Sequence, residues 1–570
     1  MSANSYIKAV LNEISPRTNI TSLSKNIKGD IIAGITVGII ALPLALAFGE
    51  ISQLGPIAGV WGAIAGGIVG GFFGGCLVGV SGPTAPKAAQ IAAYMSFFVI
   101  GSTNDPDLVA AFSIIFISGI ILVIISFARI SHFIHYTPYP VVAGFMCGIG
   151  VIVISTQLNA FVGIEFKKSI HDVIINLSDT INNANIEALY VSLPSLAILF
   201  FWPFLGKKYA ILNKVPAPLT ALVVGTYIAQ FFNLDIPYIR DKMGNTEANQ
   251  IFSIYLPDLS RTISFISPAF ALAALAVLDS LLSCKVADNI TGKRHSSDRE
   301  TFGQGMANIA AGLFGGVTTA TATMRTVANI KFGGKTPLAS IVHGLTLLAV
   351  LLGLGSLVAK IPTACLAAIL FKVGIEILDY RIIPVINKLP IKDLIIFCMV
   401  LFITVYEDLM VAITIGVIFA VLSSIKDLKN IYNEKNIYAF VDFSDSDYAK
   451  GLDMNEKNHS NIKILNPKGS LFFGSVEKLI KSFNQIPNDN PVIIDMKEVP
   501  NIDLTGIFGL EDLVKLSQSQ NRNVAIANVN EEISSKLIAL KFVENIGSEN
   551  IDETPAKFFQ KINNDSIARY

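Results

Sequence analysis

The sequence predicts a polytopic α-helical membrane protein that carries a small, more polar α/β domain at its C-terminal end. The chain of 570 residues is 52% hydrophobic and only 15% charged, whereas a typical soluble domain carries about 25% charged residues. Apolar stretches follow one another with short breaks from Ile31 to Ile425. After about Asn430, charged residues, Asn and Ser return and the apolar runs become short. Most of the chain is therefore expected to lie in a bilayer.

The composition also excludes several classes of function. Lys and Arg total 43 and so do Asp and Glu, so the chain lacks the basic excess of a nucleic-acid-binding protein. No Ser/His/Asp, Walker or HExxH pattern is present, so we expect neither an enzyme nor a cofactor. The cysteines lie in apolar stretches without CxxC spacing, which argues against a disulfide framework and a zinc site. They are Cys76, Cys147, Cys284, Cys365 and Cys398.

The membrane part is predicted to span the bilayer about twelve to fourteen times, since each helix needs about 20 apolar residues. The first thirty residues are polar and show no cleavable signal peptide. Lys8, Arg17, Lys25 and Lys28 precede the first span, which places the N-terminus in the cytoplasm. We expect a cytoplasmic segment at 1–26, a transmembrane domain at 27–428 and a cytoplasmic domain at 429–570.

The C-terminal domain shows short apolar runs that alternate with amphipathic stretches, which is typical of an α/β fold. The expected strands are 462–465, 470–473, 492–495 and 524–527. The expected helices are 476–483, 506–519 and 534–541.

A pattern in the first half of the membrane part returns in the second half. The Gly-rich segment 73–75 precedes the small and hydroxyl residues at 81–87, and 314–316 precedes 321–326. Broken helices at matching positions of two halves are typical of a transporter's central site. A helix that begins inside the membrane exposes unpaired N–H groups and a partial positive charge, so two such helices can hold an anion. Gly and Pro clusters that only allow close helix packing are the alternative.

Asp279 is the most informative charge in the membrane part. It lies in an apolar run, where an ionisable group is costly and indicates function. Ser283 follows four residues later on the same helical face. A carboxylate and a hydroxyl are hard oxygen ligands that suit Na⁺, and the carboxyl group could instead carry a proton. Pairing of Asp279 with Lys285 or Arg325 is the structural alternative.

Two basic residues accompany the broken segments. Lys87 follows the first and Arg325 lies in the second. Either side chain could hold an oxyanion, and Arg does so through two parallel hydrogen bonds. Either could also act as a structural partner of Asp279.

Taken together, these segments resemble the SulP (sulfate permease) family of anion transporters over about residues 26–561. The resemblance in the tail is to a STAS domain, the module shared with anti-sigma-factor antagonists. The membrane motifs are 29–30, 41–49, 81–84, 140–146, 278–282, 303–308 and 312–316, and the tail motifs are 492–495 and 501–506.

The resemblance implies fourteen transmembrane helices in two inverted seven-helix repeats, which form a core domain and a gate domain with an elevator-like motion between them. It places the substrate between the third and tenth helices, near Thr84, Ala322 and Thr323. It also implies a bacterial inner-membrane location with both termini in the cytoplasm, and a homodimer to which the STAS domain contributes.

Within the family, the chain is similar to sodium-coupled bicarbonate transporters. That similarity implies a Na⁺ site made of Asp279 and Ser283 with Thr321 and Thr323. The basic residues depart from this pattern: Arg325 is absent from bicarbonate-type members and Lys87 is unusual. Extra positive charge favours a dianion. We therefore expect sulfate to be as good a candidate substrate as bicarbonate, or a slightly better one.

In the STAS domain, Thr505 matches the phospho-acceptor position of signalling relatives. A threonine at the start of a helix is also a common cap. Three other functions stay open: a proton-coupled dicarboxylate symporter, a passive anion channel, and a membrane-anchored STAS signalling scaffold.

Overall fold

The computed structural model describes most of the chain between residues 14 and 555. The described ranges are 14–95, 98–100, 105–131, 138–164, 170–209, 215–243, 254–291, 293–378, 382–406, 411–412, 415–416, 418–419, 422, 438–449, 462–487, 490–519, 522–540, 542–546, 551–552 and 554–555. The expected boundary at 428/429 lies outside these residues.

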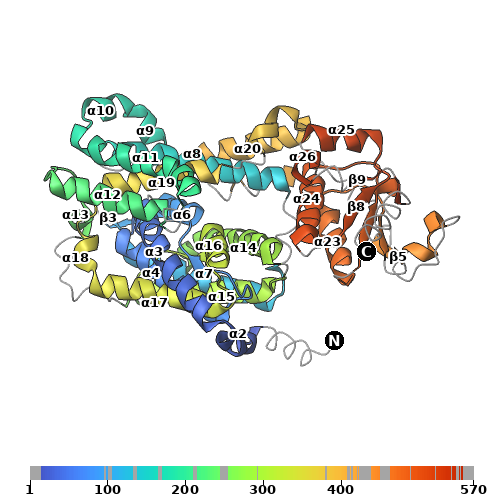
Figure 1. Cartoon of the computed structure of the whole chain (residues 1–570). Coiled ribbons are helices and arrows are strands. Elements are labelled where there is room, and N and C mark those ends of the chain that lie inside the picture. The colour runs from blue at the N-terminus through green and yellow to red at the C-terminus, as the bar shows by residue number, and fades with distance from the viewer. Residues whose placement is uncertain are drawn as a thin grey trace.

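The protein has a helical part, blue to yellow in Figure 1, and an α/β domain, orange to red, at one end of it. Among the described residues, six helices are long and apolar enough to cross a membrane. The expected number of spans, fourteen, stays a prediction. The six are Ile27–Ile51, Pro56–Phe73, Leu108–Phe127, Tyr139–Phe161, Ile186–Lys208 and Leu259–Asp288, and the shorter apolar helices are Ala217–Phe231 and Pro337–Gly353.

The helices pack as two groups, which we call the core group and the gate group. The core group contains α3 (Ile27–Ile51), α4 (Pro56–Ala65), α5 (Gly71–Phe73), α6 (Ala85–Met95), α7 (Leu108–Phe127), α14 (Thr262–Thr291), α15 (Ser297–Leu313), α16 (Thr323–Lys331) and α17 (Pro337–Gly353). The gate group contains α8 (Tyr139–Phe161), α11 (Ile186–Lys208), α12 (Ala217–Phe231), α19 (Thr363–Ile377) and α20 (Ile391–Tyr406). Short helices lie around them: α2 (Arg17–Ser22), α9 (Ile170–Ile175), α10 (Leu177–Asn182), α13 (Ile239–Met243) and α18 (Gly355–Val358).

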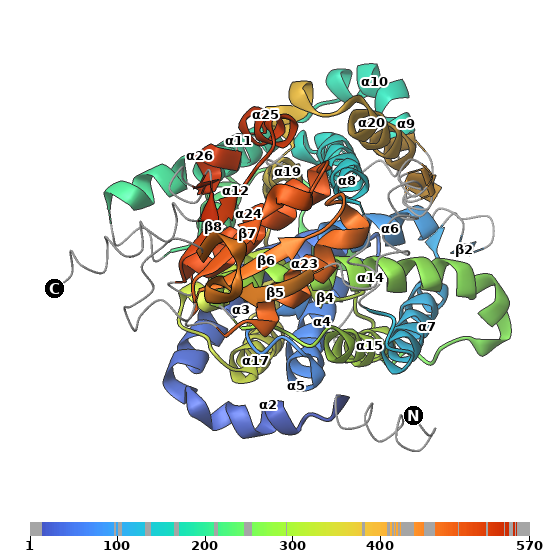
Figure 2. The same ribbon diagram turned by 90° about the vertical axis from the view of Figure 1, so that its right-hand side faces the viewer.

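The C-terminal domain has a five-stranded sheet in the order β5-β6-β7-β8-β9, antiparallel between the first two strands and parallel elsewhere. Figure 2 shows it in front of the helical part. The expected strand at 470–473 was wrong, because only Leu471 forms an isolated bridge, to Ile502, before a helix begins. The elements are β5 (Tyr438–Asp442), β6 (Lys463–Pro467), α23 (Phe473–Gln485), β7 (Val492–Asp495), α24 (Leu504–Ser519), β8 (Val524–Ala527), α25 (Glu531–Ala539), α26 (Phe542–Ile546) and β9 (Ile551–Asp552).

Helix α24 connects this domain to the membrane helices. The Asp393 carboxylate of α20 accepts the backbone N–H of Leu504 at the start of α24. In return, Thr505 Oγ1 accepts the backbone N–H of Tyr139 at the start of α8, at 3.0 Å. The Tyr139 ring also packs against Phe508, with 4.4 Å between ring centroids. The two parts therefore cap each other's helices, which satisfies N–H groups that the helices leave free.

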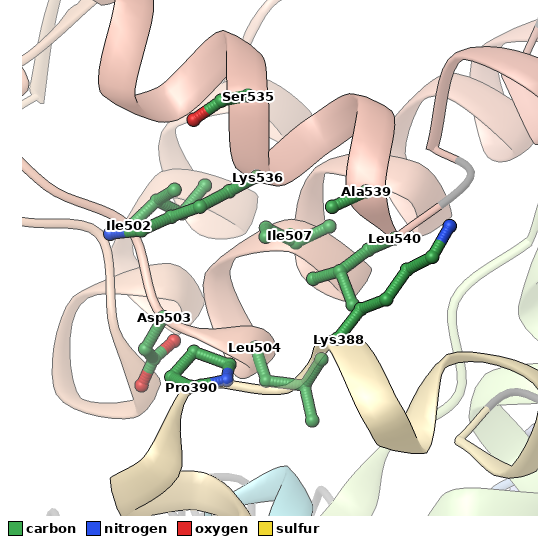
Figure 3. A pocket seen from close by; sticks show the side chains of 10 residues that line it. All are labelled: Lys388, Pro390, Ile502, Asp503, Leu504, Ile507, Ser535, Lys536, Ala539 and Leu540. Atoms are coloured by element: carbon green, nitrogen blue, oxygen red, sulfur yellow. The ribbon is translucent and has the colours of Figure 1, made fainter.

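The same helix also reaches the core group. Asp512 of α24 lies 3.8 Å from the ammonium group of Lys285 on α14. A cavity of about 270 Å³ opens beside the contact with the gate group, between the segment of Lys388 and Pro390 and the side chains of Ile507 and Leu540. Figure 3 shows these groups facing one another across it. One helix of the α/β domain thus contacts both groups of membrane helices.

A buried carboxylate ties the first membrane helix to α17. Asp30 of α3 is fully buried. Its Oδ1 accepts the N–H groups of Lys335 and Thr336 at 2.7 and 3.2 Å and the Asn26 amide at 3.0 Å, and its Oδ2 accepts the Thr336 hydroxyl at 2.6 Å. These N–H groups precede α17 directly, where a helix has no internal acceptors. Asp30 is therefore a tertiary cap of that helix.

We predict that Asp30→Ala destabilises the membrane part by about 2–4 kcal/mol, because it leaves several buried donors without an acceptor. Thermal unfolding of the purified protein in detergent measures the effect. Glu376→Ala is the matched control, since it removes an exposed partner of Lys372 at 2.8 Å and should cost less than about 0.5 kcal/mol. Equal melting temperatures for the two variants would contradict the proposed capping role of Asp30.

Candidate substrate site at two broken helices

Two short strands of the core group pair with each other, and we call the place where they pair the crossing. β1 (Ser81–Gly82) pairs antiparallel with β4 (Ala320–Thr321), with Ser81 opposite Thr321 and Gly82 opposite Ala320. The N–H of Ala322 also donates to the carbonyl of Val80 at 3.0 Å. The two segments that repeat a pattern in the sequence are thus hydrogen-bonded to each other.

Each strand leads directly into a short helix. α6 begins at Ala85, immediately after Thr84, and α16 begins at Thr323, immediately after Ala322. Ala322 offers no side-chain cap to α16. The N-terminal ends of both helices therefore lie at the strand crossing, where their first N–H groups and dipoles favour an anion. This arrangement confirms the expectation that the two half-helices are broken and lie together.

A buried polar network holds the crossing from one side. The Glu300 carboxylate of α15 accepts the N–H groups of Gly75 and Cys76, each at 2.9 Å, before β1 begins. The same carboxylate accepts the hydroxyl of Thr321 in β4. Glu300 is 2% exposed. One carboxylate thus fixes both segments.

Two further side chains of α15 extend this network. Gln304 Nε2 donates to Ser81 Oγ at 2.7 Å and to Thr321 Oγ1 at 2.9 Å. Asn308 Oδ1 accepts the hydroxyl of Thr318 at 2.6 Å and the N–H of Thr319 at 2.8 Å. The network satisfies the polar groups that strand residues bring into the helical core.

Glu300 and Asn308 were missed as site residues by the sequence analysis, as was Gln304. A signal was present, because the three recur every four residues and so share one face of α15. Polar residues in register on one face of an otherwise small-residue helix indicate a buried network.

Asp279 and Ser283, the candidate cation ligands, lie on α14 beside the helix ends. Thr84 Oγ1 donates to Asp279 Oδ2 at 2.6 Å. The hydroxyl groups of Ser283 and Thr323 lie 2.7 Å apart. A carboxylate and hydroxyl groups one helical turn apart are a donor set that fits a hard cation such as Na⁺.

Thr321, the fourth expected cation ligand, has other partners. Its hydroxyl group bonds to Glu300 and Gln304, and its N–H donates to Ser280 Oγ at 3.1 Å. Thr321 therefore lies in the network that holds the strands, and Asp279, Ser283 and Thr323 are the residues that the geometry offers to a cation.

Lys87 is fully buried in the first turn of α6. Its ammonium group donates to the carbonyl oxygen of Thr319, and its charge acts on Asp279. Asp279 does not pair with Lys285, which faces Asp512.

Arg325 is 1% exposed, and its guanidinium lies against Gly82 of β1. Within the described part of the chain, all three guanidinium nitrogens are buried without a hydrogen-bond partner. Its charge acts on His343 of α17. The guanidinium group thus lies against the paired strands, and the hydroxyl group of Thr84 reaches Asp279 of α14.

Comparisons with known proteins agree with this architecture. Residues 27–400 match the sulfate permease family, and residues 453–561 match the STAS domain. The chain is 33% identical over 537 residues to the bicarbonate transporter BicA of Picosynechococcus sp., covering 92% of each chain. It is 23% identical over 555 residues to sulfate transporter 1.1 of Arabidopsis thaliana, covering 92% of this chain and 84% of that one.

Solved structures extend the comparison. The transmembrane domain of a cyanobacterium bicarbonate transporter BicA superposes with a TM-score of 0.61 at 34% identity, covering 68% of this chain and 98% of that one. The murine Solute Carrier 26 family member A9 anion transporter, in its inward-facing state, shares the fold with a TM-score of 0.64 at 18% identity, covering 97% and 95%. The paired broken helices, the helical groups and the α/β tail therefore belong together: the chain is a member of the sulfate permease family of membrane anion transporters and carries a STAS domain.

Proposed function

We propose that this protein is a secondary-active transporter that moves an inorganic oxyanion, bicarbonate or sulfate, across a bacterial plasma membrane. The observation that carries the proposal is the antiparallel pairing of β1 with β4, which brings the N-terminal ends of α6 and α16 together. The first N–H groups of the two helices, which have no acceptor within their own helix, are the donors that an oxyanion needs.

The position of Lys87 favours bicarbonate over sulfate. Its ammonium group is hydrogen-bonded to a carbonyl group and its charge acts on Asp279, so only Arg325, which lies against Gly82 of β1, remains as a cation that would favour a dianion. The names of the relatives support the same ranking, since the bicarbonate transporter BicA is more similar to this chain than the plant sulfate transporter is.

The transport step that we propose is an elevator-like movement of the core group against the gate group. β1, β4, α6, α14 and α16 all belong to the core group, so the whole site moves as one unit if that group moves. Rigid movement of one bundle around an intact site is a common route to alternating access. A cation coupled to this movement, Na⁺ or a proton, would act at Asp279, with Ser283 and Thr323 as further ligands for Na⁺. We also propose that two copies associate and that both termini face the cytoplasm.

We predict that proteoliposomes containing the protein take up labelled bicarbonate faster than empty liposomes do, and faster with an inward cation gradient than without one. Labelled sulfate and fumarate, each with imposed Na⁺ and pH gradients, are the comparison substrates. Fumarate uptake driven by pH would favour the dicarboxylate symporter, and currents that follow voltage passively would favour a channel. No uptake of either inorganic anion above the empty-liposome control would contradict the proposal.

Asp279→Asn should abolish the cation dependence of uptake, because the amide keeps the shape and the hydrogen bond from Thr84 but removes the negative charge. The uptake rate against Na⁺ concentration and against pH measures the change. Glu376→Gln, which alters an exposed pair on the gate group, should leave the dependence as it is. An unchanged cation response in Asp279→Asn would remove Asp279 from the cation site.

We also propose a regulatory role for Thr505. Its hydroxyl group accepts the N–H of Tyr139, and the neighbouring Leu504 is held by the Asp393 carboxylate. A phosphate at Thr505 would add about two negative charges beside that carboxylate and repel it. We propose that phosphorylation of Thr505 loosens the STAS domain from the gate group.

Thr505→Glu is therefore expected to lower the stability of the contact, and Thr505→Val should cost about 1 kcal/mol by removing the acceptor. Thr505→Ser keeps the hydroxyl group and serves as the control. Limited proteolysis of the segment between the two parts, together with the uptake rate, measures the loosening. Identical cleavage in the Glu and Ser variants would contradict a regulatory role for this contact.

A further inference from the structure

Lys87 occupies an unusual position for a lysine. It is fully buried, three residues after Thr84, within the first turn of α6. Residues three apart on a helix lie on the same face. The Thr84 hydroxyl donates to Asp279, so the ammonium group of Lys87 comes from the helix face that is directed at this carboxylate. The ammonium group donates to the carbonyl oxygen of Thr319, just before β4.

Lys87 is the candidate counter-charge of Asp279. The charges of the two groups act on each other, while the hydrogen bond of the ammonium group goes to the Thr319 carbonyl and not to the carboxylate. The other charged groups near the crossing have neighbours of their own: Glu300 holds the N–H groups of Gly75 and Cys76, Arg325 lies against Gly82, and Lys285 lies near Asp512. Within the described residues, Lys87 is thus the basic side chain that enters from the same side of Asp279 as Thr84 does.

A second cation at Asp279 would have to approach Lys87. Charge–charge interactions are strong in an environment that water does not screen. An added Na⁺ beside both groups leaves a net positive site, whereas a Na⁺ that replaces the ammonium group restores neutrality. The lysine and the ion therefore exclude each other at this carboxylate.

We infer that the Lys87 ammonium group is a tethered counter-cation of Asp279, which an external coupling cation has to displace. The inference rests on the proposed transport function and deepens it, because it specifies the ion coupling of the same site. In the wild-type protein, Na⁺ binding should be weak. Removal of the tethered charge should open the carboxylate, together with the hydroxyl groups of Ser283 and Thr323, to Na⁺.

The test compares Lys87→Met with the wild-type protein during Na⁺ titration at constant ionic strength, with choline as the replacing cation. Thermal unfolding of the full-length protein in detergent reports Na⁺ binding without requiring transport, and bicarbonate uptake in proteoliposomes reports coupling. We expect the Na⁺ concentration for half-maximal stabilisation to be at least ten-fold lower in Lys87→Met. Lys331→Met removes an exposed lysine at the end of α16 and should behave as the wild type does.

Two further variants keep the test decisive. Lys87→Gln retains a donor for the Thr319 carbonyl and removes the charge, so it should show the same gain if Lys87→Met does not fold. Lys87→Met combined with Asp279→Asn should lose the gain, because the ligand that the lysine protected is then neutral.

An unchanged or weaker Na⁺ response in the uncharged variants overturns the inference, and so does a gain that persists in the double variant. Failure of the proposed function is distinguishable, because absent uptake in every variant leaves the thermal measurement of Na⁺ binding intact.

Discussion

The hydrogen bonds of Glu300 are the interaction on which the rest of the site depends. This carboxylate binds the chain before β1 and a hydroxyl group within β4, so it sets how far apart the two broken segments lie. Without that connection, two helix ends with free N–H groups inside a membrane would be unstable, since no water is available to satisfy them. The proposed anion site and the proposed cation ligands both depend on this fixed crossing.

The polar residues around the crossing form two separate sets. Glu300, Gln304 and Asn308 on one face of α15 form hydrogen bonds to the strand segments. Asp279 and Ser283 on α14 approach the helix ends from the other side, where Thr84 and Thr323 meet them. Because the residues of α15 have partners of their own, an ion at the helix ends would leave their hydrogen bonds to the strand segments in place.

Much of this arrangement could be predicted from the sequence. The repeated Gly-rich entries located both broken helices, and the isolated carboxylate in an apolar run located Asp279. The part that could not be predicted was which way each long side chain turns. Lys87 and Arg325 look alike in the sequence as basic residues near broken helices. In the structure, Lys87 donates to the Thr319 carbonyl, whereas Arg325 lies against Gly82 without a hydrogen-bond partner among the described residues. The prediction of a strand at 470–473 was wrong because a short apolar run is compatible with an isolated bridge as well as with a strand.

Helix α24 contacts α8 and α20 through Thr505 and Leu504, and α14 through Asp512. These contacts span the boundary along which the membrane part is expected to slide. A rigid helix cannot follow two bodies that move apart, so the proposed movement would break one set of these contacts. The contact with α14 includes the ion pair of Lys285 and Asp512 at 3.8 Å. Under the proposed movement, the α/β domain would therefore resist the displacement of one helical group against the other.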